Sequence, residues 1–167
     1  MGMTLIEEID AGGVASFSFT GIPQDHLDLL VVVSARNQYS TNTLNCYLNA
    51  DTNNSNYQTQ YLGINSGNSP EAGNYAGRPY TFINNSTDAS AIFSNTKIYI
   101  SDYATSDNKM MSIDTTAPTD NDYQDAKRYI LSSSYLTTSP ITSILFSNNS
   151  NPLLAGSTAS LYAITAD

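Results

Sequence analysis

Apolar and polar residues alternate in short segments of this chain, and turn-forming residues separate the segments. In residues 14–20, for example, Phe17 and Phe19 fall on one side of an extended backbone, whereas Ser16 and Ser18 fall on the other. This period of two recurs and predicts about ten short strands with polar turns between them. The predicted strands span residues 4–9, 14–20, 27–36, 44–48, 58–64, 89–93, 96–101, 109–115, 127–135, 141–147 and 158–164.

Three segments depart from simple alternation. Residues 29–33 form a continuous apolar run, which is typical of a central strand covered on both faces. Residues 65–80 contain five glycines and prolines among polar neighbours, so we expect the longest irregular segment there. Residues 120–130 are a weak helical candidate, because they carry no apolar stripe.

Together these patterns predict an all-β protein, an antiparallel jelly-roll-like β-sandwich of about ten strands. No segment repeats at a fixed period, which disfavours a propeller or a β-solenoid. A length of 167 residues fits one domain, so we expect residues 1–167 to form a single sandwich.

Composition narrows the possible functions. The chain has 15 acidic and 6 basic residues and a net charge of −9, which argues against binding nucleic acid or anionic membranes. Cys46 and His26 are the single cysteine and histidine, so an intrachain disulfide and any site with two histidines are excluded. Serine, threonine and asparagine supply 58 residues and charged residues only 13%, which predicts a neutral polar surface.

No secretion signal or membrane-spanning run is visible in the sequence. The first eight residues include Glu7 and Glu8 and lack a cleavable apolar stretch. The longest apolar run, residues 29–33, is far too short to cross a bilayer. We therefore expect synthesis in a cytoplasm, followed by assembly into a larger structure.

Two sets of residues suggest catalysis, and neither meets its requirements. His26 lies between Asp25 and Asp28, but the sequence has no Gly-x-Ser-x-Gly motif to supply a nucleophile, so a solvated histidine in a turn is favoured. Glu7 and Glu8 are adjacent in a predicted strand and therefore face opposite ways, unlike the paired acids of a glycosidase. We expect no enzymatic activity, no catalytic residues and no cofactor.

Residues 49–56 place side-chain oxygens at alternate positions around Asp51, as in half of a calcium-binding loop. The segment lacks the glycine and the closing glutamate of such a loop. A hairpin loop capped by Asx turns is therefore favoured, although Asp51 as a metal ligand stays open.

Tyrosine occurs 12 times and tryptophan never. A tyrosine ring offers a flat apolar face with a hydroxyl group, which suits a sugar ring or a protein partner. Strand formation and subunit packing are the favoured roles of these residues, and glycan binding is the alternative. The candidate contact residues cluster in the middle of the chain and are Tyr57, Tyr61, Tyr75 and Tyr80.

Three sets of segments share a pattern: residues 5–7, 16–19, 21–24 and 27–36, then 48–57, and finally 98–104, 141–144 and 155–164. In these segments the sequence resembles small virion proteins of marine and freshwater tailed phages. The similarity covers most of the chain and lies in strand cores and turns, so it transfers no ligand positions. Ala163 replaces an expected glycine, and an expected tryptophan before residue 141 is absent, with Tyr135 the nearest aromatic residue.

This resemblance implies a structural protein of a phage particle. A capsid decoration, or cement, protein is expected first: a homotrimer that docks on the capsid exterior and bridges subunits of the major capsid protein. The absence of a heptad stem or collagen-like shaft favours that reading. Met110, Met111 and exposed tyrosines are expected to contribute to its contacts. The alternative is a tail-fibre or tail-tip receptor-binding module that recognises host surface glycans through the tyrosine-rich segment.

Overall fold

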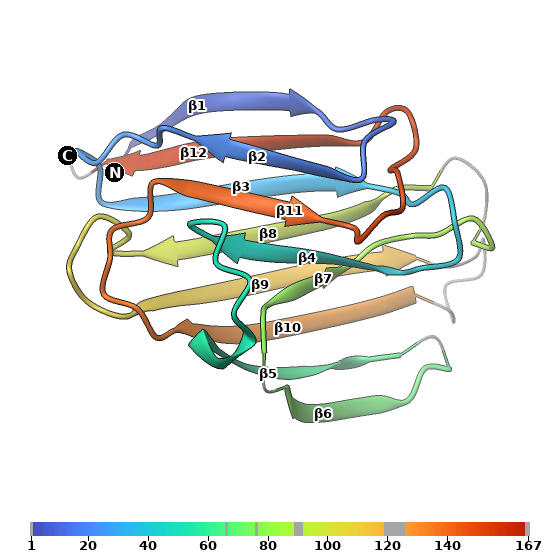
Figure 1. Ribbon diagram of the computed structural model, residues 1–167. Coiled ribbons are helices and arrows are strands. Elements are labelled where there is room, and N and C mark those ends of the chain that lie inside the picture. Colours follow the sequence, from blue (N-terminus) through green and yellow to red (C-terminus); the bar gives the residue numbers. More distant parts are fainter. Residues whose placement is uncertain (1, 66, 76, 89–91, 119–125, 166–167) are drawn as a thin grey trace.

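The computed structural model describes residues 2–65, 67–75, 77–88, 92–118 and 126–165 (Figure 1). It consists of two antiparallel sheets packed face to face, so the predicted all-β sandwich is confirmed. The larger sheet has, in spatial order, β1 (Gly2–Asp10), β12 (Thr158–Thr165), β3 (Asp28–Ala35), β8 (Ser94–Ser101), β9 (Lys109–Pro118), β10 (Ala126–Tyr135), β5 (Tyr57–Ile64) and β6 (Pro70–Tyr75). The smaller sheet has β2 (Ser16–Thr20), β11 (Ser143–Ser147), β4 (Thr43–Leu48) and β7 (Tyr80–Phe82).

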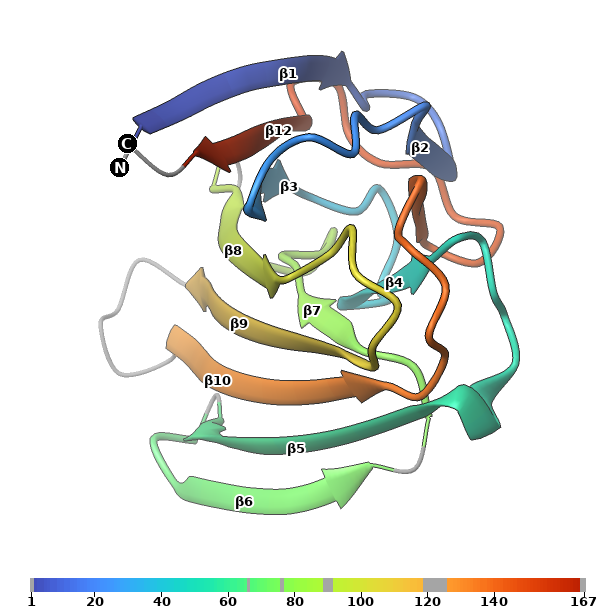
Figure 2. The ribbon, with the colours of Figure 1, turned by 90° about the vertical axis from the view of Figure 1, so that its left-hand side faces the viewer.

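The eight-stranded sheet curves around the four-stranded sheet, with β1 and β6 at its two ends (Figure 2). We call the face of the large sheet that points away from the small sheet the outer face. Because the large sheet has twice as many strands, β5 and β6 extend past the small sheet at one end. This difference in width exposes side chains that a sandwich of equal sheets would cover.

Alternation of side chains builds the core between the sheets. In β8 and β9 every second residue is buried, as a strand covered on one face requires. Inward side chains from both sheets belong to one hydrophobic cluster. Its fully buried members include Phe19, Leu29, Leu44, Ile98, Ile113, Leu131, Ile144, Phe146 and Leu161.

The apolar run at residues 29–33 forms most of β3, as predicted, but cover on both faces is wrong. Leu29, Val31 and Val33 are buried, whereas Leu30 and Val32 on the outer face are only half-buried. No second layer packs on this face in the part of the chain that the structure describes. The run therefore lies in an interior strand of the sheet, but only one face of that strand is fully buried.

The prediction of an irregular segment at residues 65–80 is also wrong in part. Residues 70–75 form β6, which pairs with β5, and residue 80 begins β7. A strand at residues 89–93 is not observed where the chain is described, because β8 begins only at Ser94. Residues 119–125 lie outside the described part, and residues 126–130 of the weak helical candidate belong to β10.

The jelly-roll topology stays a prediction. The one helical segment in the described residues is the short 3-10 turn η1 (Asn54–Asn56). No helix in the described part of the chain is long and apolar enough to span a membrane.

Candidate functional site

An aromatic cluster fills the end of the sandwich where the large sheet extends past the small one. Tyr129 of β10 stacks on Phe82 of β7 with 4.1 Å between ring centroids, and Tyr61 of β5 meets Tyr129 edge-on at 6.2 Å. Tyr80 meets Phe82 edge-on at 5.4 Å. These contacts connect the two sheets through four rings, of which Tyr129 is buried and Tyr61, Tyr80 and Phe82 remain half-exposed.

The sequence grouped four tyrosines, but the structure does not place them on one surface. Tyr57 is only 1% exposed and stacks on Tyr135 at 4.8 Å inside the core. Its hydroxyl donates to the Asp51 carbonyl at 3.0 Å and accepts from the Leu48 backbone N–H at 3.0 Å. Tyr57 is therefore a packing residue, and its ring presents no face to a ligand.

The other three tyrosines lie at the β5–β6–β7 end of the molecule. Tyr75 ends β6 opposite Thr59 in the β5–β6 pairing, and its side chain lies outside the described part of the structure. Tyr61 and Tyr80 meet indirectly, through Tyr129 and Phe82. Sequence analysis missed Tyr129, because its partners come from strands distant along the chain.

The outer face near this end carries an apolar patch that sequence analysis did not single out. We call it the β6 corner and define it by Leu62, Ile64, Pro70, Arg128 and Ile130. Leu62 is 61% and Ile130 is 54% exposed, and both are directly paired across β5 and β10. The five side chains, with Gly63, line a shallow open groove of about 250 Å³.

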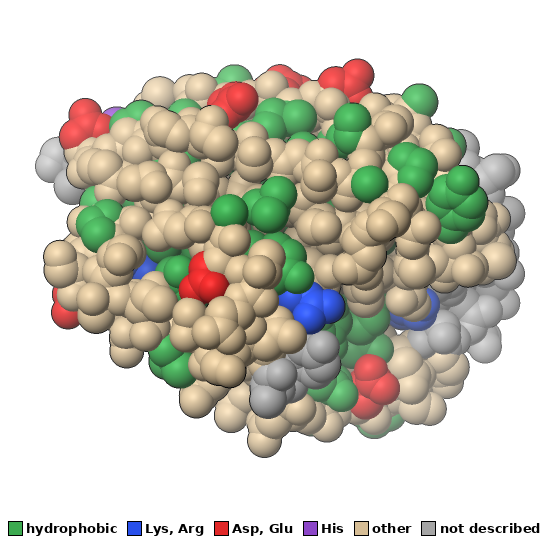
Figure 3. Space-filling view, in the orientation of Figure 1, with side chains coloured by type: hydrophobic (Ala, Val, Ile, Leu, Met, Phe, Trp, Pro, Cys, Tyr) green, Lys and Arg blue, Asp and Glu red, His purple; other side chains and the backbone are tan. Residues whose placement is uncertain are grey.

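A signal for this corner does exist in the sequence. The outward positions of β5 are Gln58, Gln60, Leu62 and Ile64, so the side that should be polar becomes apolar halfway along the strand. Exposed apolar patches commonly mark protein contacts. On the face shown in Figure 3, few charged side chains are visible, in line with the low content of charged residues.

Asp51 is held by hydrogen bonds from within the fold. One carboxylate oxygen accepts from the Asn53 backbone N–H at 2.9 Å, and the other accepts from Asn56 Nδ2 at 2.6 Å and the Tyr135 hydroxyl at 3.1 Å. Partial burial raises the pKa of Asp51, but these donors outweigh it and hold the pKa below its usual value. Both oxygens are thus engaged by the hairpin, which supports the Asx-turn interpretation. Within the described residues, no cluster of three or more His, Cys, Asp or Glu residues could hold a metal ion.

The residues considered for a catalytic triad are not arranged as one. His26 Nε2 lies 3.4 Å from an Asp25 oxygen in an exposed turn. Asp28 instead accepts hydrogen bonds from the Tyr99 hydroxyl and from the Asp102 backbone N–H, the latter at 2.8 Å. The bond from Tyr99 to Asp28, together with partial burial, raises the pKa of Tyr99 to about 12. Asp28 therefore connects β3 to the β8–β9 turn.

Lys109 and Cys46 are also buried ionisable groups. Lys109 is fully buried, and its ammonium group donates to the carbonyls of Thr105 and Asp107, so it organises the turn before β9. Burial raises the pKa of the Cys46 thiol to about 12, so the thiol stays protonated and unreactive at neutral pH.

The methionine pair considered for subunit contacts divides between the two faces of β9. Met110 is 48% exposed, whereas Met111 is buried in the core, because adjacent strand residues point in opposite directions. Only Met110 can therefore contribute to an outer contact.

Comparison with known proteins adds no relative to this description. No protein-family model, curated protein or solved structure matches the chain. The two antiparallel sheets define the chain as an all-β sandwich protein.

Proposed function

We propose that this protein is a structural component of a tailed-phage particle, and specifically a capsid decoration protein. The observation that carries the proposal is where the exposed apolar side chains lie. The β6 corner is a shallow surface on a sheet, with apolar side chains and one arginine around an open groove. A surface of this shape suits contact with a folded protein in an assembled particle, whether another copy of this chain or a capsid subunit, better than it suits the enclosure of a small substrate.

The arrangement of buried polar groups also supports a mechanical role. Asp28, Asp51 and Lys109 are each engaged by hydrogen bonds that connect strands or close turns. Groups used in this way rigidify a fold and leave little polar chemistry free for catalysis. The resemblance to small phage virion proteins in strand cores and turns also favours a structural role.

The proposed mechanism is reinforcement of the shell. A preformed sandwich docks on the outer capsid and contacts neighbouring copies of the major capsid protein, so that separating those copies also requires breaking the docked contacts. Burial of each large apolar side chain contributes roughly 1.5–3 kcal/mol. Because many copies bind one particle, modest individual contacts add up to a large resistance to internal pressure.

Copy number in purified virions tests this proposal. Quantitative mass spectrometry should find the protein at an abundance comparable to that of the major capsid protein. A few copies per particle would contradict the capsid role and support the alternative, a tail-tip receptor-binding module. Absence from the particle would contradict both.

The alternative has one structural observation in its favour. Tyr61 and Tyr80 are half-exposed at the open end of the sandwich, where an aromatic ring can stack on a sugar. Host glycans would be the ligand in that case.

A further inference from the structure

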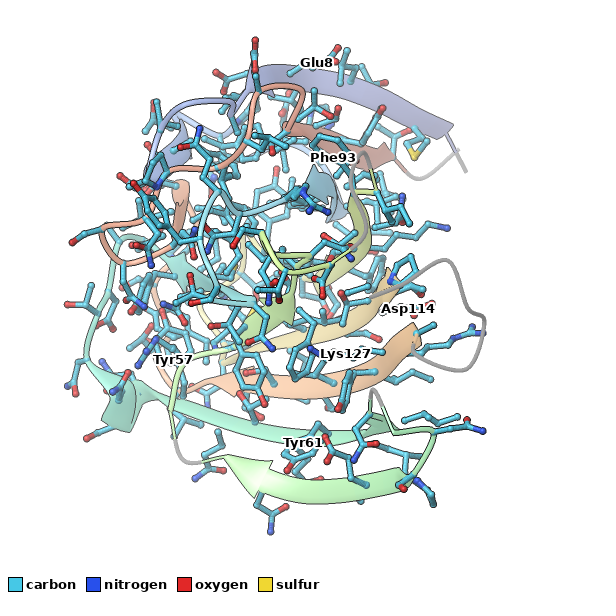
Figure 4. All side chains as sticks on the ribbon, turned by 90° about the vertical axis from the view of Figure 1, so that its right-hand side faces the viewer. Glu8, Tyr57, Tyr61, Phe93, Asp114 and Lys127 are labelled. Carbon is cyan, nitrogen blue, oxygen red and sulfur yellow. The ribbon has the colours of Figure 1, made fainter. Side chains whose placement is uncertain are left out.

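The two ends of the large sheet expose side chains of opposite charge. At one end, β1 carries Glu7, Glu8 and Asp10, all exposed. At the other end, the β6 corner contains Arg128, which is exposed and makes no ion pair in the described part of the chain. Figure 4 shows Glu8 at the β1 end of the sheet, far from β10 and β5. These opposite charges therefore cannot meet within one molecule.

Each end also exposes apolar side chains beside its charges. On β1, Met3 is 60% and Leu5 is 49% exposed. At the β6 corner, Leu62 and Ile130 flank the groove. The two ends thus match in both respects: apolar residues can meet apolar residues while acidic residues meet a basic one.

The spacing of these residues also matches. Leu5 and Glu8 pair with Tyr162 and Ser160 of β12, which are successive residues on the outer side of that strand. A β-bulge after Leu5 produces this alignment. Successive outward residues on a strand are separated by about 7 Å.

Residues at the β6 corner are also separated by two positions along a strand, and therefore by about 7 Å. Ile130 and Arg128 are successive outward residues of β10, paired with Leu62 and Ile64 of β5. The outermost strand does not block the groove, because its residues at these positions are the small Ala72 and Pro70. Leu5 of another molecule can therefore enter the groove at Leu62 and Ile130 while its Glu8 reaches Arg128.

We infer that the β6 corner binds the β1 edge of a second copy of this chain, with Leu5 in the groove and Glu8 against Arg128. Contact between two β1 edges is disfavoured, because it would bring carboxylates together. Since the two surfaces are different, the contact can form twice between two copies related by a twofold axis, or can repeat from copy to copy around a larger ring.

Sedimentation of the purified chain with charge-reversed variants tests the inference. The wild-type protein should have a mass of at least twice 18.0 kDa. Glu8→Arg and Arg128→Glu should each weaken self-association about tenfold or more, because like charges then face each other. The double variant should restore assembly. Lys97→Glu reverses an exposed charge in the middle of the same face and should leave assembly unchanged.

Cysteine cross-linking tests directly whether the β1 edge of one copy meets the β6 corner of another. Leu5→Cys and Leu62→Cys should each remain uncross-linked alone and should form a disulfide-linked pair when mixed and oxidised. The native Cys46 is buried and does not interfere. Circular dichroism of every variant should match the wild type, because all the substituted side chains are exposed.

Several results would overturn the inference. They are a wild-type mass of 18.0 kDa at all concentrations, assembly that survives both single charge reversals, and a double variant that stays dissociated. Cross-linking of either cysteine variant with itself would also overturn it. None of these measurements involves a virion, so the inference stands or fails separately from the proposed function.

Discussion

The carboxylate of Asp51 receives hydrogen bonds from its own hairpin and from Tyr135, which lies 84 residues further along the chain. Hydrogen bonds to a carboxylate favour its charged form, and its pKa in the folded protein is accordingly lowered. The hairpin, β10 and the buried Tyr57 meet at this residue. A position that resembles a metal ligand in sequence is thus a junction between strands.

Acid should abolish the contribution of Asp51 to stability. Because its folded-state pKa lies below the unfolded value, the contribution is complete above the unfolded pKa and is lost as pH falls through the folded pKa. At neutral pH, Asp51→Asn should lower the free energy of unfolding by about 1 kcal/mol, a modest value because solvent weakens interactions at this partly exposed site.

Urea unfolding of wild type and Asp51→Asn at neutral and acidic pH measures this effect. The difference between the two proteins should shrink in acid. Asp114→Asn, an exposed position on the outer face, is the matched control and should change stability little at either pH. A difference for Asp51→Asn that is independent of pH would contradict the explanation.

At the scale of elements, Gly63 of β5 packs closely against Tyr129, its partner on β10. The Tyr129 ring crosses this glycine, and its hydroxyl donates to Glu71 on β6. A Cβ atom on Gly63 would lie 2.3 Å from Tyr129 Cδ1 and 2.4 Å from the Arg128 carbonyl oxygen. The close approach of backbone and ring therefore requires glycine at this position.

Gly63→Ala should destabilise the protein by about 1–3 kcal/mol, because the Arg128 backbone cannot easily move away. Thermal unfolding measures the loss. Gly67→Ala in the neighbouring turn is the control, since its Cβ would meet only Asn65 Oδ1 at 3.5 Å. Equal effects of the two substitutions would show that the packing of Tyr129 on Gly63 does not matter.

At the scale of the whole molecule, the two sheets share one hydrophobic cluster. Phe146 of the small sheet is fully buried, and its ring stacks on Phe17 at 5.0 Å. Core residues of the large sheet, such as Leu131 and Leu161, belong to the same cluster. A core substitution on one sheet should therefore destabilise both sheets together.

Phe146→Ala should lower the free energy of unfolding by about 3–5 kcal/mol, through lost burial and the cavity that remains. Far-UV circular dichroism and tyrosine fluorescence should report the same shifted transition, because most buried tyrosines contact the large sheet whereas Phe146 lies on the small one. Leu27→Ala, at a site 42% exposed, should cost much less. Two separate transitions would show that the sheets unfold independently.

Much of the fold follows from local pattern. The alternation around Phe17 and Phe19, for example, correctly predicted that β2 is a strand and that these two side chains face the core. Such a prediction is possible because period two is a property of any extended backbone. Where alternation was weak, as in residues 70–75, a strand was missed, because β6 exists through its pairing with β5. Tyr57 was predicted as a candidate contact residue because sequence cannot show which tyrosines a second sheet covers.

The sequence by itself determined the β class, the low content of charged residues and the lack of paired histidines and cysteines, because these depend on composition and on spacing along a few residues. The tertiary structure decided which faces are covered and which ends stay open. The small sheet covers only part of the larger one, so Leu62 and Ile130 are exposed while Tyr57 and Phe146 are buried. These outcomes depend on pairing between strands far apart along the chain, and local pattern carries no information about such pairing.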